Sequence, residues 1–106
     1  MGFVAVFITT ASGKEADKIA RGLVGRGLAA CVNIIPSVKS VYTWKGRLEV
    51  SNEFLLMAKT KQSLFCKLEK TVRSMHSYDC PEIISVPVNK GSRDYLQWLG
   101  SSIKKR

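Results

Sequence analysis

Two long strand-like segments joined by a two-residue turn constrain the fold more than any other feature. Residues 38–44 place Val, Ser, Tyr and Trp at every second position, which is the pattern of a β-strand. Lys45-Gly46 follows as a tight turn, with the glycine suited to a positive φ. The return strand runs from Arg47 to about Lys59. The chain is therefore predicted to contain an antiparallel β-hairpin.

This hairpin is long for the size of the chain. Leu28 to Trp44 is 17 residues, which would span roughly 55 Å when fully extended at about 3.3 Å per residue. A domain of this size has a radius of gyration of only about 13 Å. We therefore expect the hairpin either to extend beyond the sheet or to bend, with Pro36 as the place of the bend, and to carry Tyr42 and Trp44 at its far end. An exposed apolar edge of this kind predicts self-association.

The remaining segments alternate between strand and helix patterns. Residues 3–9 are predicted to form a strand that is buried on both faces. Ser12 and Glu15 fit a capping box at the start of a helix that Gly27 ends. A second helix is expected over residues 61–76, a strand over 82–89 and a short helix after Ser92.

The predicted order is β-α-β-β-α-β-α. With right-handed crossovers, this order gives an α+β fold, a ferredoxin-like β-α-β-β-α-β sandwich with a long hairpin and a short C-terminal helix. A length of 106 residues is too short for two independent cores, so residues 1–106 are predicted to form a single domain.

The composition indicates a globular protein without a membrane-spanning helix. Apolar residues make up 45% of the chain, which is typical of a globular protein. No apolar stretch reaches the roughly 18 residues of a membrane helix, and residues 1–8 resemble a strand more than a signal peptide. Cys31, Cys66 and Cys80 form no CxxC pair, which favours reduced thiols. We therefore expect a cytoplasmic protein without a membrane partner.

The chain is strongly basic, with 17 Lys and Arg residues against 8 Asp and Glu residues and a net charge of +9. Such a charge makes nucleic-acid binding an alternative function of another class. However, the basic residues are scattered along the sequence. Domains that recognise RNA also stack bases on aromatic residues of two central strands, and residues 55–59 have none. Nucleic acid is therefore an unlikely partner on these grounds.

Two sets of residues are candidates for a binding site. His76 is the only histidine, and Cys80 follows it by four residues; repeated across the copies of a self-associated chain, this pair would offer ligands for copper. Met75 lies on the apolar stripe of the second helix and is assigned to the core. The second set combines aromatic surface with opposite charges, as in a polar interface pocket, and consists of Tyr42, Trp44, Lys59, Tyr78 and Glu82.

No catalytic signature is present. The sequence has no Ser-His-Asp order, no HExxH motif and no phosphate-binding loop. Glu53 and Glu82 are available as a pair of carboxylates, but nothing in the sequence places them together. We therefore expect a binding protein and not an enzyme, with no certain cofactor; a divalent cation, copper, is the one candidate.

Four blocks of the chain resemble the signature of the CutA family: residues 28–34 (LAACVNI), 40–46 (SVYTWKG), 76–84 (HSYDCPEII), and Gly91 with residues 95–98 (YLQW). The resemblance implies a ferredoxin-like subunit in a homotrimer, similar in shape to the PII signalling proteins. It also implies a role in tolerance of copper and other divalent cations. A PII-like regulator that binds a small ligand or a protein partner is the alternative within this class.

The sequence departs from the family at the copper site proposed for bacterial relatives. Those relatives have a cysteine at the end of the first strand and two consecutive histidines, where this chain has Ile8, Met75 and His76. One of three ligands remains. We therefore predict that any binding of Cu(II) or Zn(II) is weak and depends on His76, because one imidazole cannot fill a tetrahedral site.

Overall fold

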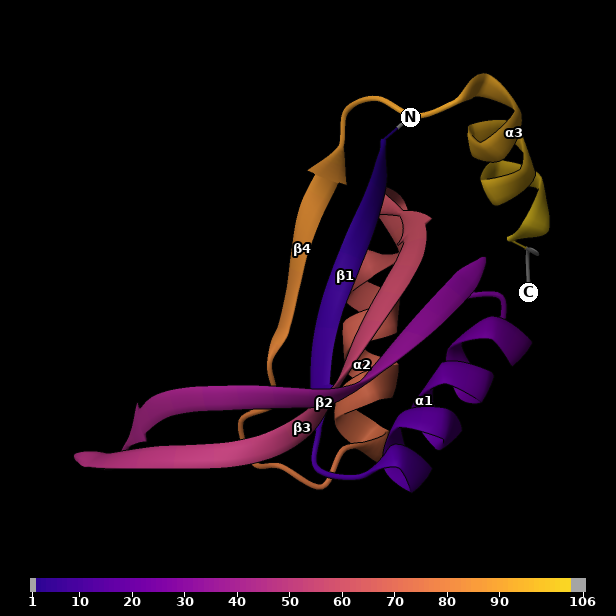
Figure 1. Cartoon of the computed structure of the whole chain (residues 1–106). Helices are drawn as coiled ribbons and strands as arrows, with labels where there is room; N and C mark the ends of the chain where they lie inside the picture. Colours follow the sequence, from indigo (N-terminus) through magenta and orange to yellow (C-terminus); the bar gives the residue numbers. More distant parts are fainter. Residues whose placement is uncertain (1, 104–106) are drawn as a thin grey trace.

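The computed structural model describes residues 2–103, and its elements follow the order predicted from the sequence (Figure 1). They are β1 (Phe3–Thr10), α1 (Gly13–Gly25), β2 (Cys31–Trp44), β3 (Arg47–Lys61), a 3-10 turn (Gln62–Leu64), α2 (Phe65–Met75), β4 (Ile83–Val88) and α3 (Arg93–Ser102). The four strands form one antiparallel sheet in the order β2-β3-β1-β4. This confirms the ferredoxin-like α+β fold.

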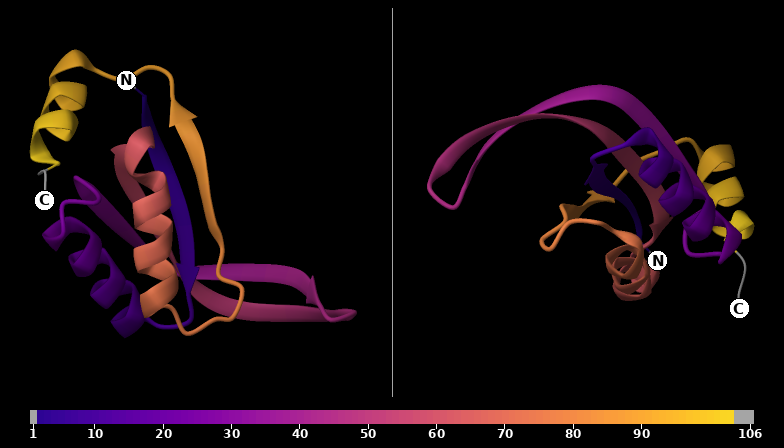
Figure 2. Two further views of the ribbon diagram at one scale, coloured as in Figure 1. Left: turned by 180° about the vertical axis from the view of Figure 1, so that it is seen from behind. Right: turned by 90° about the horizontal axis from the view of Figure 1, so that it is seen from below.

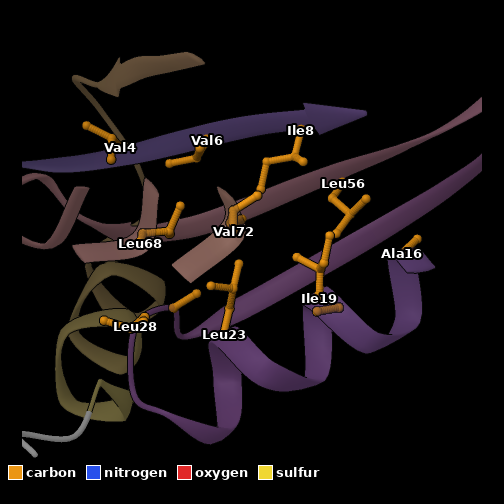
Figure 3. Packing of buried hydrophobic residues seen from close by; sticks show 13 residues of the cluster. Val4, Val6, Ile8, Ala16, Ile19, Leu23, Leu28, Leu56, Leu68 and Val72 are labelled. Carbon is orange, nitrogen blue, oxygen red and sulfur yellow. The ribbon is translucent and has the colours of Figure 1, made fainter. Parts of the chain in front are cut away.

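The two faces of the sheet have different neighbours. We call the side covered by α1 and α2 the helical face (Figure 2), and the opposite side the open face. On the helical face, buried residues of β1 and β3 pack against one apolar side of each helix (Figure 3). Fully burying a residue such as Leu23 or Leu68 contributes about 1.5–3 kcal/mol to folding. The main members of this core are Val4, Val6, Ile8, Ile19, Leu23, Leu56, Leu68 and Val72.

The ends of α1 explain why it occupies residues 13–25. Ser12 caps the helix by accepting a hydrogen bond from the backbone N–H of Glu15 at 3.1 Å. The predicted capping box is only half formed, because the Glu15 carboxylate turns to Ser77. Gly27 has a φ of +72°, which ends the helix as predicted. The backbone N–H of Leu28 then bonds to the Leu23 carbonyl oxygen at 2.9 Å.

The segment boundaries differ slightly from the prediction. β2 begins at Cys31 and not at Leu28, because residues 28 and 29 bond back to the end of α1. The predicted second helix over 61–76 is replaced at its start by the 3-10 turn, and α2 itself covers 65–75. The last strand is 83–88 instead of 82–89. None of these differences changes the topology.

The hairpin bends where it was predicted to bend. The pairing of β2 with β3 shifts register between Ile35 and Val38, and Ser37 has a φ of +63°, which together form a β-bulge beside Pro36. Beyond the bulge the hairpin extends away from the rest of the molecule (Figure 1). The longest dimension of the molecule, hairpin included, is 44 Å. Lys45 and Gly46 both have positive φ values, as a type I′ turn requires.

The open face is covered only in part. Gly100 of α3 lies against the ring of Phe3, so α3 packs at one end of this face. Further along, Ile35, Ile84 and Val86 are between 39% and 54% exposed. In the part of the chain that the structure describes, no helix has the length and apolar character needed to cross a bilayer.

Candidate functional site

A cavity of about 390 Å³ lies where the hairpin leaves the sheet. Three parts of the chain form it: the end of β1, the outer half of the hairpin, and the loop of residues 76–82 between α2 and β4. Its walls are Thr9, Tyr42, Trp44, Glu53, Tyr78, Asp79, Cys80 and Glu82. We call this cavity the hairpin pocket.

The pairing of the two hairpin strands decides which residues face the pocket. Val38 lies opposite Glu53, and Tyr42 lies opposite Glu49, so these side chains share one face of the hairpin. Tyr42 is held in place by a hydrogen bond of 2.9 Å between its hydroxyl and that of Ser51. The hairpin therefore presents Tyr42, Trp44 and Glu53 to the pocket, and turns Val41, Leu48 and Val50 to the opposite face.

His76 holds the loop against β1. Its Nε2 lies 2.7 Å from the carbonyl oxygen of Thr9, and its Nδ1 accepts the backbone N–H of Tyr78 at 3.1 Å. Since Nδ1 is an acceptor, the ring proton sits on Nε2 and is donated to Thr9. The imidazole is 0% exposed, and its ring stacks at an angle on that of Tyr78, with centroids 4.7 Å apart. Both ring nitrogens are thus engaged within the chain.

Glu15 fixes the same loop from the helical side. Its Oε2 accepts the backbone N–H of Ser77 at 2.6 Å, and its Oε1 accepts the Ser77 hydroxyl at 3.1 Å. Oε2 also lies 3.7 Å from Nδ1 of His76. These contacts explain why the loop after α2 has one defined position next to the pocket.

The acidic side chains of the pocket interact with one another and with Tyr78. The Tyr78 hydroxyl donates to Oε2 of Glu53 at 2.7 Å. Burial, followed by this hydrogen bond and by the charge of Glu53, raises the pKa of Tyr78 above its usual value. The pKa of Glu82 is also raised from 4.5, first by desolvation and then by the charge of Glu53. The charge of Glu53 therefore acts on both Tyr78 and Glu82.

The structure brings together most of the residues predicted from the sequence. Tyr42, Trp44, Tyr78 and Glu82 all line the hairpin pocket. Lys59 does not: it lies on the same strand face as Glu53 but six residues further along, roughly 20 Å away at 3.3 Å per residue. There its ammonium group bonds to Asn33 and lies 3.8 Å from the sulfur of Cys31.

The two residues predicted to bind metal lie in different surroundings. Cys80 is an exposed free thiol that lines the pocket, whereas the His76 imidazole is buried behind the loop. Within residues 2–103, no three His, Cys, Asp or Glu side chains gather closely enough to hold a metal ion. The assignment of His76 and Cys80 to a metal stays a prediction. A cation at His76 would have to displace one of its two hydrogen bonds.

Sequence reasoning did not place Thr9 or Asp79 in the site, and it gave Glu53 no defined partner. Glu53 follows the polar pair Ser51-Asn52, and neither its neighbours nor its spacing distinguishes it from a solvated hairpin residue. Its burial to 6% exposure arises only when the loop carrying Tyr78 packs on the hairpin. An acidic residue inside an otherwise basic chain is the one signal that the sequence offered.

Comparisons with known proteins give one consistent answer. The model of the CutA1 divalent ion tolerance protein family matches residues 4–102. A Xenopus laevis protein named CutA homolog is 48% identical over 99 residues, which are 93% of this chain and 66% of that protein. Against a human protein named CutA the identity is 47%, and the chain covers only 53% of its length. The chain thus spans between about half and two thirds of these relatives.

Solved structures agree with the sequence comparisons. The divalent cation tolerance protein Cut A1 from Thermus thermophilus superposes with a TM-score of 0.89 at 43% identity, over 92% of this chain and 94% of that one. A protein from Archaeoglobus fulgidus, described as a periplasmic divalent cation tolerance protein, gives a TM-score of 0.93 at 36% identity over 96% and 99% of the two chains. The similarity includes the hairpin and the pocket-forming loop, since it covers nearly the whole chain.

Proposed function

This chain belongs to the CutA1 divalent ion tolerance protein family, and on that premise we propose that it is a non-catalytic binding protein of metal-ion tolerance that works as a homotrimer. The observation that carries the proposal is the family match over residues 4–102. The assembly and the metal binding are tested by separate experiments.

The exposed apolar surface supports the trimer. Val41, Leu48 and Val50 lie on the hairpin face opposite the pocket and are between 56% and 73% exposed. Ile84 and Val86 add apolar surface on the open face. Exposed apolar residues gathered in this way mark surfaces that other chains cover, and β2 and β4 are the two edges of the sheet, where a further strand can pair.

Sedimentation equilibrium tests the assembly. We expect a trimer for the unchanged chain, and a shift towards monomer for Val50→Asp, because a charge at the centre of an apolar contact opposes association. Val24→Asp is the matched control, since Val24 is 44% exposed on α1 beside the start of β2 and lies outside the outer half of the hairpin. A monomer at micromolar concentration would refute the proposed assembly, as would equal dissociation of the two variants.

Copper is the cation that we propose, bound weakly through His76 and Cys80. The two hydrogen bonds of His76 compete with any cation, so a dissociation constant of about micromolar or weaker is expected. Calorimetry on the unchanged chain, His76→Ala and Cys80→Ser measures this directly. Loss of binding in His76→Ala would support the assignment. Tight binding that survives both substitutions would mean that other residues hold the metal.

We further propose that residues 1–106 act as one domain in the cytoplasm. The single core cluster that joins β1, β3, α1 and α2 supports the first point. Three free cysteines, which are common in reducing compartments, support the second. Because one similar structure is described as periplasmic, fractionation of cells that express the chain is the deciding measurement.

A further inference from the structure

The hairpin pocket concentrates negative charge on a basic protein. The chain has a net charge of +9 and only 8 acidic residues, yet Glu53, Asp79 and Glu82 all line this one cavity. No Lys, Arg or His is among the residues that line it. Acidic side chains that collect in one cavity without basic partners create a local potential that attracts cations.

Glu53 shows that the pocket lacks a counter-charge. Glu53 is only 6% exposed, and within residues 2–103 its carboxylate forms no ion pair. Oε2 accepts the Tyr78 hydroxyl. No buried side-chain oxygen of the described residues lacks a hydrogen-bond partner, so Oε1, which has no protein donor among residues 2–103, is open to the solvent of the pocket. Oε1 is therefore available to a positively charged donor that enters the pocket, and such a donor would offset the cost of holding a largely buried carboxylate.

The shape and walls of the pocket indicate which kind of cation fits. Tyr42, Trp44 and Tyr78 provide aromatic surface, which attracts organic cations by cation–π interaction and packs against apolar stems. The volume of about 390 Å³ is within the range of small-molecule sites, about 300–1,000 Å³. In contrast, the carboxylates do not converge closely enough to hold a bare metal ion, as judged for residues 2–103.

We propose that the hairpin pocket binds a primary ammonium group on an apolar stem, with the ammonium at Glu53 and Glu82 and the stem against Trp44 and Tyr42. A primary ammonium has three N–H donors, enough to satisfy Oε1 of Glu53, the Glu82 carboxylate and the hydroxyl of Thr9. Cys80 lines the pocket and is the one residue shared with the copper ligands proposed above, whereas Glu53→Gln tests the ammonium site without altering either copper ligand.

Nuclear magnetic resonance with butylammonium chloride tests the proposal. The chain has two tryptophans: Trp44 lines the pocket, and Trp98 lies on α3 and serves as an internal control. We expect the indole N–H signal of Trp44 to shift and saturate while that of Trp98 stays in place. Saturation at about millimolar concentration is expected for so small a probe. 1-Pentanol, a neutral molecule of similar length, and sodium chloride at equal ionic strength should cause no saturable shift.

Matched variants test whether the Glu53 carboxylate binds the ammonium group. Glu53→Gln keeps the size of the side chain but removes its charge, and should weaken butylammonium binding about tenfold or more. Glu69→Gln makes the same change in net charge on the outer side of α2, where Glu69 pairs with Arg73, and should leave binding unchanged. Equal effects of the two variants, or an equal response to 1-pentanol, would overturn the proposal.

The cysteines give a second readout. Cys80 lines the pocket and Cys66 is exposed on α2, so butylammonium should slow alkylation of Cys80 by iodoacetamide and leave the rate at Cys66 unchanged. Equal rates with and without the amine at both cysteines would contradict occupancy of the pocket.

The same chemistry has two possible sources, a free amine or a lysine side chain of a second copy. Butylammonium that binds to the assembled protein assigns the pocket to a free amine. Binding only to the Val50→Asp variant, in which assembly is weakened, assigns it to a lysine that the second copy supplies. No response of Trp44 in either state would refute the ammonium site.

Discussion

Tyr78 and Glu53 are joined by a hydrogen bond of 2.7 Å between the phenolic hydroxyl and the carboxylate, although 25 positions separate them in the sequence. This bond connects the loop after α2 to the hairpin and closes one side of the pocket. Its loss should therefore affect both the stability of the fold and the shape of the site.

Tyr78→Phe tests this link. Removing the hydroxyl leaves the buried Glu53 carboxylate without its donor, which should lower the free energy of unfolding by about 1–3 kcal/mol. Urea denaturation at fixed protein concentration measures the change. Tyr42→Phe is the control, because its partner Ser51 is near solvent and the bond is exposed; a cost well below about 1 kcal/mol is expected there. Equal costs would show that the burial of Glu53 does not matter.

Glu82 should titrate above its usual range. Its pKa is raised by desolvation first and by the charge of Glu53 second, so folding favours the protonated form. Its contribution to stability is complete below the ordinary pKa of 4.5 and is lost as the pH rises through the raised value. Titration followed through the side-chain carboxyl carbon should show this pKa falling towards 4.5 in Glu53→Gln, without reaching it. Tyr42, Tyr78 and Asp79 face the same pocket, and an unchanged pKa in Glu53→Gln would assign the shift to desolvation alone.

His76→Ala should loosen the loop of residues 76–82. The substitution removes the bonds to the Thr9 carbonyl and to the Tyr78 backbone N–H, so the amides of residues 77–80 should exchange with solvent faster. The amides of α2 over residues 68–72, a range that begins and ends with the core residues Leu68 and Val72, serve as the reference. Unchanged exchange in the loop would mean that Glu15 alone positions it.

Two glycines provide a matched test of the hairpin turn. A Cβ added at Gly46 or at Gly25 would meet nothing within 4 Å, but only Gly46 has a positive φ, +78°. Gly46→Ala should therefore destabilise the protein by about 1 kcal/mol through backbone strain alone. Gly25→Ala, at the end of α1, should stabilise it by up to about 1 kcal/mol. Thermal unfolding of both variants gives the comparison, and a tolerated Gly46→Ala would argue against the type I′ turn.

The sequence was sufficient for the topology because each element carries its own local signal. Gly27 and Gly46 mark a helix end and a turn through their positive φ values, and Ser12 marks a helix start through its side-chain cap. The bend was predictable from the length of the segment together with the position of Pro36. The start of β2 was not, since it depends on how residues 28 and 29 bond back to α1.

The candidate site was predictable only as far as residue type could indicate it. The combination of aromatic and acidic residues predicted Tyr42, Trp44, Tyr78 and Glu82 as members of a binding site. Lys59 shared their composition, but its distance along β3 separates it from them. Glu53 enters the site through long-range packing, which no local pattern reports. His76 was assigned to a metal because it is the only histidine; in the structure its Nε2 bonds to Thr9 of β1 and its Nδ1 to Tyr78 of the loop.

The bulge beside Pro36 has a consequence for how this hairpin tolerates insertions and deletions. Between Ile35 and Val38 the chain advances by three residues while β3 advances by two, from Leu55 to Glu53. The extra residue shifts the alternation of side chains by one position. Even-numbered residues of β2 beyond the bulge therefore lie on the side of the hairpin where odd-numbered residues lie before it. Deleting Ser37 alone would restore a regular ladder in which Val38 stays opposite Glu53 and Tyr42 stays opposite Glu49, so the hairpin would lose its bulge while Tyr42 and Trp44 remain on the pocket side. Removing one residue from each strand beyond the bulge would instead turn every residue nearer the turn to the opposite face. The arm therefore keeps its two surfaces after a length change of one residue only where that change falls in the bulge.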